Sequence, residues 1–279
     1  MKRVNAYSQI CLYLTAVFFF QACKKQETAT LRPNALDSTP IITSVLNPVT
    51  FSINNKIGGY YVALPSNYNQ TAEYYPLLLY IHGAGQFGNG SLDLPLLLND
   101  GPAELVDEKK FPGTFRVNDK NYSLIVLTPQ TKTFPSIADI TDCIKFAKTK
   151  YRIDSTRIYL SGLSIGSIAI CNTAAEIPSE IAAIVTMAGV PPDYATTDKC
   201  QKIAASNLPV WSFHSEDDRT IDVSNTKGFI AKLISYSPAI TPKLTIWKDG
   251  GHDAWTRALN PSYKEDNMNI YEWMLQYHR

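Results

Sequence analysis

The stretch that most constrains the fold is residues 157–170, which read RIYLSGLSIGSIAI. A short β-branched and aromatic run ends in Gly162-Leu-Ser164-Ile-Gly166, and an apolar run with helical character follows. Glycines two positions before and after a serine suit a strand that turns sharply into a helix, because a side chain at either position would collide with a neighbouring element. The pattern therefore predicts a strained turn that displays Ser164 above the N-terminus of a helix, as in a nucleophile elbow.

Apolar runs typical of strands alternate with helical patterns along most of the chain. Strands are expected at 49–53, 59–64, 77–81, 124–127, 158–160, 181–187, 209–213 and 243–247, and helices at 137–150, 164–176, 223–235 and 263–277. The first two strands form an antiparallel hairpin, whereas continuous apolar runs such as 77–81 indicate strands buried on both faces of a parallel sheet. The pattern predicts one α/β domain with about eight mostly parallel strands and helices on both faces.

The N-terminus has the pattern of an export signal. Lys2 and Arg3 precede an apolar segment at 10–20, which is shorter than the roughly 20 residues of a membrane span and suits a signal peptide. Ala22 then precedes Cys23, which resembles the lipobox of a bacterial lipoprotein, in which the cysteine is lipidated and becomes the mature N-terminus. The alternative is an ordinary secretory signal followed by an incidental cysteine.

The domain organisation that follows has three parts. Residues 1–22 are interpreted as a lipoprotein signal peptide, 23–46 as a flexible polar tether, and 47–279 as the catalytic domain. Such a protein is anchored to a membrane of the bacterial cell envelope through Cys23, on the periplasmic side or the outer surface.

Composition excludes several kinds of partner. The formal net charge is +1, and no basic cluster with interleaved aromatic residues is present, so no nucleic-acid partner is expected. Three cysteines follow the predicted tether, Cys143, Cys171 and Cys200, and no Cys/His spacing indicates a metal site. Cys143 and Cys171 lie in apolar helical patterns that favour buried thiols. Neither a metal nor an organic cofactor is expected.

Polar motifs follow three further strands at the point where each strand ends. His82-Gly-Ala-Gly85 follows 77–81, His214 to Ile221 follows 209–213, and Lys248 to Trp255 follows 243–247. In an open α/β sheet, reactive groups collect beyond the carboxyl ends of the strands. The histidines that open the first two motifs, His82 and His214, are interpreted as residues that brace their loops.

From about residue 49 to the C-terminus the chain resembles the α/β-hydrolase fold. Within that fold it is similar to a branch of esterases and predicted peptidases that includes secreted feruloyl and acetyl esterases and polyhydroxyalkanoate depolymerases. The matching stretches are 76–85, 151–157, 214–221 and 251–257, together with the elbow. The chain departs from the pattern at Ser167, where a second glycine is frequent, and at Ser215, where glycine is usual after the histidine. The resemblance implies a serine hydrolase.

The residue types required for such a reaction occur in the chain order Ser164, Asp218, His252, which is that of α/β-hydrolases. Ser164 is the expected nucleophile, and His252 is the base that removes its proton and later returns it to the leaving group. The acid that orients His252 is Asp218 or its neighbour Asp217, and the motif spacing of the family implies Asp218. Asp253 is expected to be a loop residue.

Two backbone N–H groups are expected to form the oxyanion hole. One belongs to Ile165, directly after the serine, and the other to Ala84 in the loop after 77–81. Trp255 and Gln86 are candidates for the wall of the substrate pocket.

The short connection at 188–208, where related hydrolases insert a lid, predicts an open cleft. With an envelope location, this favours a bulky or polymer-attached ester, such as an acetyl or feruloyl group on a polysaccharide. Three alternatives remain open at this point: a serine peptidase with the same triad, a polyhydroxyalkanoate-type depolymerase, and a lipid-anchored binding protein without catalytic activity.

Overall fold

The computed structural model describes residues 44–191, 193 and 198–279. The predicted signal peptide, Cys23 and most of the predicted tether lie outside the described residues. The first strand, β1, begins at Val45, two residues before the predicted start of the domain at 47. Among the helices of these described ranges, none has both the length and the hydropathy of a membrane span.

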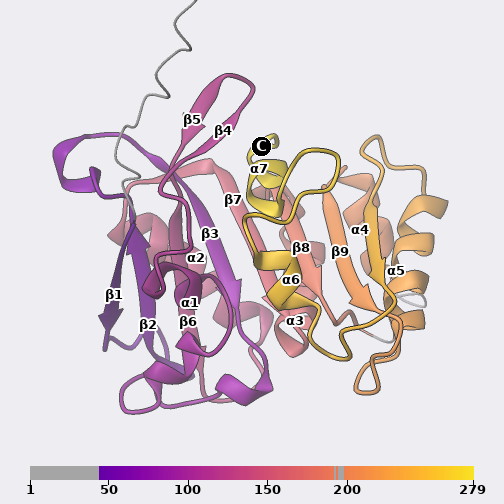
Figure 1. The fold of residues 1–279 in the computed structure, drawn as a ribbon, viewed down its shortest axis with the longest axis horizontal. Helices are drawn as coiled ribbons and strands as arrows, with labels where there is room; N and C mark the ends of the chain where they lie inside the picture. The colour runs from indigo at the N-terminus through magenta and orange to yellow at the C-terminus, as the bar shows by residue number, and fades with distance from the viewer. Residues whose placement is uncertain (1–43, 192, 194–197) are drawn as a thin grey trace, which may run out of the picture. The chain divides into compact units, whose positions relative to one another are not determined.

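The described chain is organised around an eight-stranded sheet with the order β1-β2-β6-β3-β7-β8-β9-β10 (Figure 1). Strand β2 is antiparallel to both β1 and β6, and all pairs from β6 to β10 are parallel. The number of strands, the N-terminal hairpin and the mostly parallel pairing confirm the predicted fold class. The strands are β1 Val45–Val49, β2 Ile57–Leu64, β3 Tyr75–Ile81, β6 Ile125–Thr131, β7 Ile153–Leu163, β8 Ala183–Met187, β9 Val210–Ser215 and β10 Lys243–Trp247.

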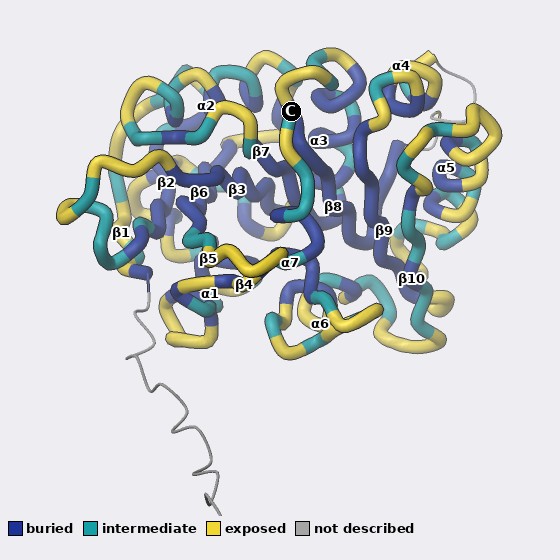
Figure 2. The backbone as a smooth tube through the Cα atoms, turned by 90° about the horizontal axis from the view of Figure 1, so that it is seen from above, coloured by how far each residue is buried: buried dark blue, intermediate teal, exposed yellow. Residues whose placement is uncertain are grey.

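Helices cover both faces of this sheet, also as predicted (Figure 2). One face packs against α2 Ile137–Lys150, α3 Ile165–Glu176, α4 Lys199–Ala205 and α5 Val223–Ser235. The other packs against α1 Pro102–Asp107, α6 Trp255–Leu259, α7 Ile270–Leu275 and a hairpin of β4 Phe115–Val117 and β5 Lys120–Tyr122. Short 3-10 helices occur at η1 Tyr68–Gln70, η2 Ala84–Gln86, η3 Leu94–Leu98 and η4 Pro178–Glu180.

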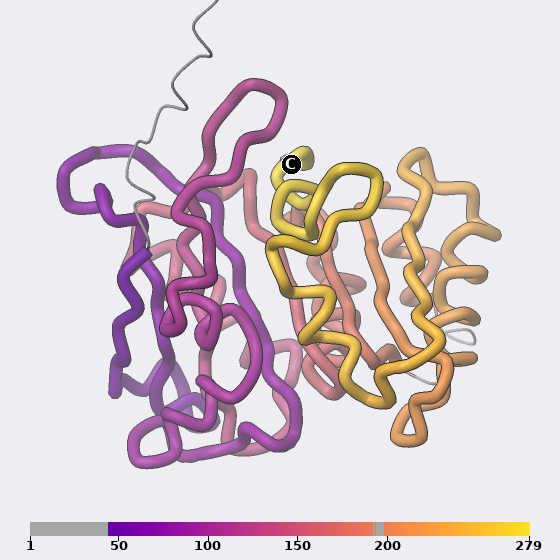
Figure 3. The backbone as a smooth tube through the Cα atoms, viewed as in Figure 1, coloured from indigo at the N-terminus to yellow at the C-terminus, as the bar shows by residue number. Residues whose placement is uncertain are grey.

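Strands β3 and β6 are buried over their whole length, which explains their continuous apolar sequences. All seven residues of β3 and all seven of β6 are buried. Burying apolar surface on both faces contributes about 25 cal/mol per Å², so these strands fix the position of the loops at their carboxyl ends. The last segment of the chain, yellow in Figure 3, returns to the middle of the sheet, where Tyr271 of α7 packs on Phe111 and Phe115.

Two sequence predictions about the ends of the domain are wrong. The predicted strand at 49–53 lies earlier, at β1, because an edge strand tolerates Pro48 in its interior. The predicted helix at 263–277 is shorter, since a capping box of Asn269 and Glu272 starts α7 only at Ile270.

Candidate active site

The turn between β7 and α3 consists of Ser164 alone, because β7 ends at Leu163 and α3 begins at Ile165. Ser164 has a φ of 51° and a ψ of −120°, a strained conformation for a residue with a side chain. Its backbone N–H donates to the carbonyl of Met187 at the end of β8 at 2.8 Å. The neighbouring strand therefore holds the turn, and the serine side chain lies at the carboxyl end of the sheet, as the motif predicted.

The glycines on both sides of the serine are required by the close approach of backbone atoms from β3, the residue after it, and α3. A Cβ atom on Gly166 would lie 2.7 Å from the carbonyl oxygen of His82 and would collide with that of Ile81. A Cβ atom on Gly162 would lie 2.7 Å from the carbonyl carbon of Gly166. Both contacts are with backbone atoms, which cannot move aside without displacing the end of β3 or the start of α3.

Gly166→Ala is therefore expected to lower the free energy of unfolding by about 2–3 kcal/mol, the cost of overpacking a buried contact. Gly228→Ala in α5 is the matched control, since nothing lies within 4 Å of the Cβ atom that it would add. Replacing glycine with alanine inside a helix raises the free energy of unfolding by up to about 1 kcal/mol. Urea unfolding of both variants measures the difference, and equal midpoints would contradict this account of the elbow.

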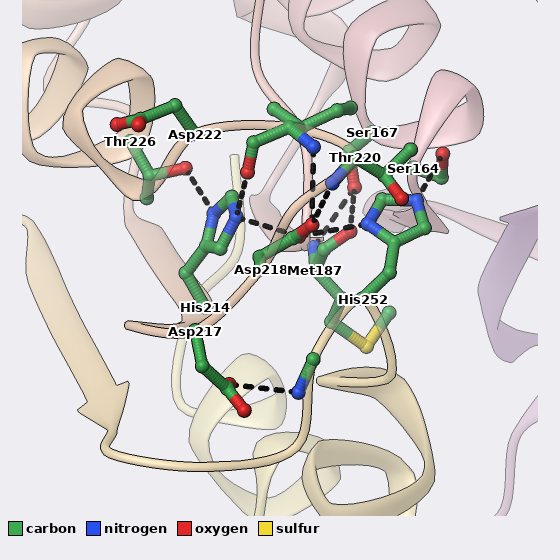
Figure 4. A network of polar contacts seen from close by, with 12 residues as sticks. Ser164, Ser167, Met187, His214, Asp217, Asp218, Thr220, Asp222, Thr226 and His252 are labelled. Atoms are coloured by element: carbon green, nitrogen blue, oxygen red, sulfur yellow. Dashed lines mark hydrogen bonds and ion pairs between the residues drawn. The ribbon is translucent and has the colours of Figure 1, made fainter.

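Loops after β9 and β10 bring two further side chains to the serine (Figure 4). His252 Nε2 lies 2.9 Å from Ser164 Oγ, and His252 Nδ1 lies 2.7 Å from Asp218 Oδ2. The three residues predicted from sequence are thus joined in one chain of hydrogen bonds. Gly250 and Gly251 have φ values of 129° and 59°, so the loop that carries His252 depends on glycine.

The structure distinguishes the two neighbouring aspartates. Asp217 accepts a hydrogen bond from the backbone N–H of Gly251 at 2.8 Å, so it holds the histidine loop from outside. Asp218 is buried, and its Oδ1 accepts the backbone N–H groups of Thr220 and Ile221 at 2.8 and 3.0 Å. Burial acts to raise the pKa of Asp218, but hydrogen bonds, that of His252 foremost, outweigh it and hold the pKa below its ordinary value. Asp218 is therefore an ionised acceptor.

A second histidine contacts the same carboxylate, which sequence reasoning did not anticipate. His214 Nε2 lies 3.0 Å from Asp218 Oδ2 and 3.0 Å from the carbonyl oxygen of Ile221. Because both are acceptors, Nε2 carries the hydrogen, and Nδ1 accepts from the hydroxyl of Thr226 at 2.7 Å. Burial lowers the pKa of His214, so the ring is neutral. His214 was interpreted as a loop brace, and it is also a second donor to Asp218; the four-residue spacing between them is the signal that could have indicated this.

Removal of this donor is expected to shift the pH profile of activity. In His214→Phe the negative charge of Asp218 is shared with fewer donors, so Asp218 stabilises the imidazolium form of His252 more strongly. The acid limb of kcat/KM should move to higher pH by about half a unit or more. His214→Gln, which keeps an N–H donor, should show little of this shift. Profiles of kcat/KM against pH test this, and an acid limb unchanged in His214→Phe would contradict it.

Two helix starts adjoin the serine. Ile165 is the first residue of α3, and Ala84 is the first residue of η2, so the N–H group of each lacks an acceptor within its own helix. A Cβ atom on Gly83, just before η2, would lie 3.8 Å from the Cβ of Ser164, which places this loop beside the serine. The two N–H groups predicted for the oxyanion hole thus lie on elements that flank Ser164.

His82 braces the loop that carries Ala84. Its Nδ1 donates to the carbonyl of Gly83 at 2.7 Å, and its Nε2 accepts the backbone N–H of Thr131 at 3.0 Å. Burial lowers the pKa of His82 to about 4, so it stays neutral and keeps this pattern near neutral pH. These contacts agree with its interpretation as a brace.

A hollow of about 360 Å³ opens beside these groups, and we call it the catalytic cavity. Its wall includes Ser164, His252, Gln86 and Trp255. The amide nitrogen of Gln86 donates to the carbonyl of Asp100 at 3.3 Å, and the residue is only 3% exposed, so Gln86 mainly fixes the wall.

Trp255 forms one side of the catalytic cavity and supports the histidine. Its indole N–H donates to Asp100 Oδ1 at 2.7 Å, and its ring packs edge-on against His252 with centroids 5.4 Å apart. Within residues 44–191, 193 and 198–279, no group of three His, Cys, Asp or Glu side chains could hold a metal ion. What the arrangement supplies is an oriented hydroxyl, a base and backbone donors.

Comparison with known proteins places the chain among carboxylesterases. A model of the phospholipase/carboxylesterase family matches residues 125–265, a range that contains Ser164, Asp218 and His252. A bifunctional acetylxylan esterase/xylanase of Neocallimastix patriciarum is 25% identical over 225 residues, which are 76% of this chain and 27% of that protein. The chain thus spans about a quarter of the length of the curated relative that it matches.

Solved structures share the fold at low identity. A thermostable esterase superposes with a TM-score of 0.59 and 22% identity, covering 86% of this chain and 64% of that one. A ferulic acid esterase superposes with a TM-score of 0.57 and 16% identity, covering 78% of this chain and 95% of that one.

Proposed function

Since the chain belongs to the phospholipase/carboxylesterase family and has the α/β-hydrolase fold, we propose that it hydrolyses carboxylic esters through an acyl-enzyme on Ser164. The observation that carries this proposal is the continuous path of hydrogen bonds from Asp218 through His252 to Ser164, at 2.7 and 2.9 Å. A serine hydroxyl is a poor nucleophile near neutral pH, and a base at this distance is what activates it.

In the first half of the reaction, Ser164 Oγ forms a bond to the ester carbonyl carbon while His252 Nε2 takes its proton. The carbonyl oxygen gains a negative charge that the N–H groups of Ala84 and Ile165 stabilise, each contributing about 3 kcal/mol. The imidazolium of His252 is stabilised by ionised Asp218. When the tetrahedral species collapses, the bond to the alcohol oxygen breaks and His252 returns the proton to that oxygen.

In the second half, water takes the place of the alcohol. His252 removes a proton from the water as it attacks the acyl carbon, and the bond to Ser164 Oγ breaks as the proton passes to the serine. The products are a carboxylic acid and the original enzyme.

For the substrate we propose an acetyl or feruloyl ester attached to a carbohydrate. The similarity to an acetylxylan esterase/xylanase and to a ferulic acid esterase supports this class. Assays with p-nitrophenyl acetate, methyl ferulate and the corresponding anilides test the reaction type. We expect the esters to be hydrolysed faster than the anilides by several orders of magnitude. Faster cleavage of the anilides would contradict this proposal and favour a serine peptidase with the same triad.

We also propose that the domain is exported and anchored by a lipid on Cys23, which lies outside the described residues. The support is the sequence pattern of the N-terminus, with an apolar segment ending in Ala22-Cys23. In a bacterial host fed an alkyne-tagged fatty acid, the full chain should be labelled and recovered with membranes. The Cys23→Ser variant should carry no label. Equal labelling of the wild-type chain and the variant, or no labelling of either, would contradict the proposed lipid anchor.

A further inference from the structure

A second hollow lies next to the catalytic cavity and is lined in part by residues of α1 and α6. These two helices lie on the same face of the sheet (Figure 2). Its volume is about 430 Å³, and Trp255 lines both it and the catalytic cavity. Asp100 and Gly101, adjacent in the chain, line one hollow each. We call the second hollow the outer pocket.

The reaction geometry places the outer pocket on the alcohol side of the ester. His252 must deliver its proton to the leaving oxygen, so the alcohol part of a bound ester lies next to His252. Trp255 packs against that ring with a centroid separation of 5.4 Å, and the outer pocket begins at Trp255. A substituent that extends from the leaving oxygen past Trp255 would therefore reach the outer pocket.

The lining of the outer pocket suits a molecule with both an apolar face and many hydroxyl groups. Leu105 and Leu259 contribute apolar surface together with Trp255. Around them stand polar side chains that accept or donate hydrogen bonds, among them Glu104, Asn260 and Ser262. Polar and apolar surface contribute about equally to the lining, so a ligand that presents both kinds of surface fits it best.

The charge of the outer pocket restricts what kind of alcohol can bind. Glu104 and Glu108 contribute two carboxylates, and the single ammonium group, that of Lys110, is already paired with Glu108 at 2.8 Å. Burial, followed by the charges of Glu108 and Asp100, raises the pKa of Glu104, which reflects the negative surroundings. An anionic alcohol, such as a lipid headgroup phosphate, would be repelled, and like charges at an interface are a common means of rejecting a partner.

We propose that the outer pocket binds a neutral sugar unit of the leaving alcohol and makes the protein selective for carbohydrate esters over phospholipids. This inference rests on the proposed ester hydrolysis at Ser164 and goes beyond it, because it assigns the selection of the alcohol to α1 and α6. Glu104 accepts hydrogen bonds from sugar hydroxyls. Trp255 lies between the catalytic cavity and the outer pocket, where the alcohol passes from one to the other.

The test compares esters that share one acyl group and differ in the alcohol. In the acetyl or the feruloyl series, whichever the enzyme cleaves faster, kcat/KM is measured for the methyl ester, a neutral pentose ester and an ester of an anionic alcohol. Ser262→Trp places a large ring at the rim of the outer pocket, and Ser179→Trp in η4, at the opposite ends of the strands, is the matched control. Glu104→Gln keeps a hydrogen-bonding group and removes the charge.

The wild-type protein should prefer the pentose ester to the methyl ester by about tenfold, roughly the effect of one or two hydrogen bonds. Ser262→Trp should remove that preference while the methyl ester is still cleaved, Ser179→Trp should match the wild type, and Glu104→Gln should improve cleavage of the anionic ester. If the wild-type protein hydrolysed all three esters at the same rate, or if Ser262→Trp lowered kcat/KM equally for all three, the role of the outer pocket would be overturned and the proposed ester hydrolysis would stand. If the wild-type protein hydrolysed none of the three esters, the proposed function would be overturned as well.

Discussion

Replacing Ser164 with alanine is expected to lower kcat for ester hydrolysis by about 10⁵- to 10⁶-fold. The variant keeps His252 and the N–H groups of the oxyanion hole but has no oxygen that can form the acyl-enzyme. The remaining rate comes from binding and electrostatic stabilisation alone, which support about 10³- to 10⁴-fold acceleration over water in serine hydrolases.

The measurement is burst and steady-state kinetics with p-nitrophenyl acetate. Ser179→Ala, a change on the exposed surface of η4, serves as the control and should retain wild-type kinetics. Activity within tenfold of wild type in Ser164→Ala would remove the serine from its role. Urea unfolding of the variant should give a midpoint no lower than that of wild type, because the backbone strain at Ser164 does not depend on the hydroxyl.

Asp218→Asn is expected to have the second largest effect, a loss of about 10⁴-fold in kcat. The backbone N–H groups of Thr220 and Ile221 require an acceptor at Oδ1, so the amide oxygen takes that position. The amide NH₂ group then faces His252, which must accept the hydrogen bond at Nδ1 and carry its own hydrogen on Nε2. In that tautomer His252 cannot receive a proton from Ser164.

Asp217→Asn is the matched comparison, because Asp217 is the neighbouring carboxylate and contacts only the loop backbone at Gly251. Its activity should remain within a few-fold of wild type. A large loss in Asp217→Asn together with a small one in Asp218→Asn would show that the acid had been assigned to the wrong residue.

Much of the fold could be predicted because its central strands are buried on both faces. A run such as 77–81 has no polar position, which distinguishes it from a surface strand. α2 and α5 were predicted with their observed bounds, since Ser136 and Asp222 cap their N-termini with side-chain hydrogen bonds. The elbow could be predicted because its two glycines indicate positions where another backbone segment comes too close for a side chain.

The features that could not be predicted depend on contacts that only the folded structure defines. The hydrogen bond between Trp255 and Asp100 joins residues 155 positions apart, and neither residue's neighbours indicate it. The four-residue spacing between His214 and Asp218 is compatible with a contact, but the turn between them decides which of their atoms face one another. The small hairpin of β4 and β5 is too short to give a periodic pattern.

The central claim is that Ser164 is an activated nucleophile, and its most direct test is covalent labelling by a fluorophosphonate followed by mass spectrometry of the digested protein. One adduct per chain is expected, on the peptide that contains Ser164, and it should be absent from Ser164→Ala. The label should also form much more slowly in Asp218→Asn, because His252 then lacks the tautomer that removes the serine proton. An unlabelled wild-type protein, or an adduct on another residue, would contradict the account.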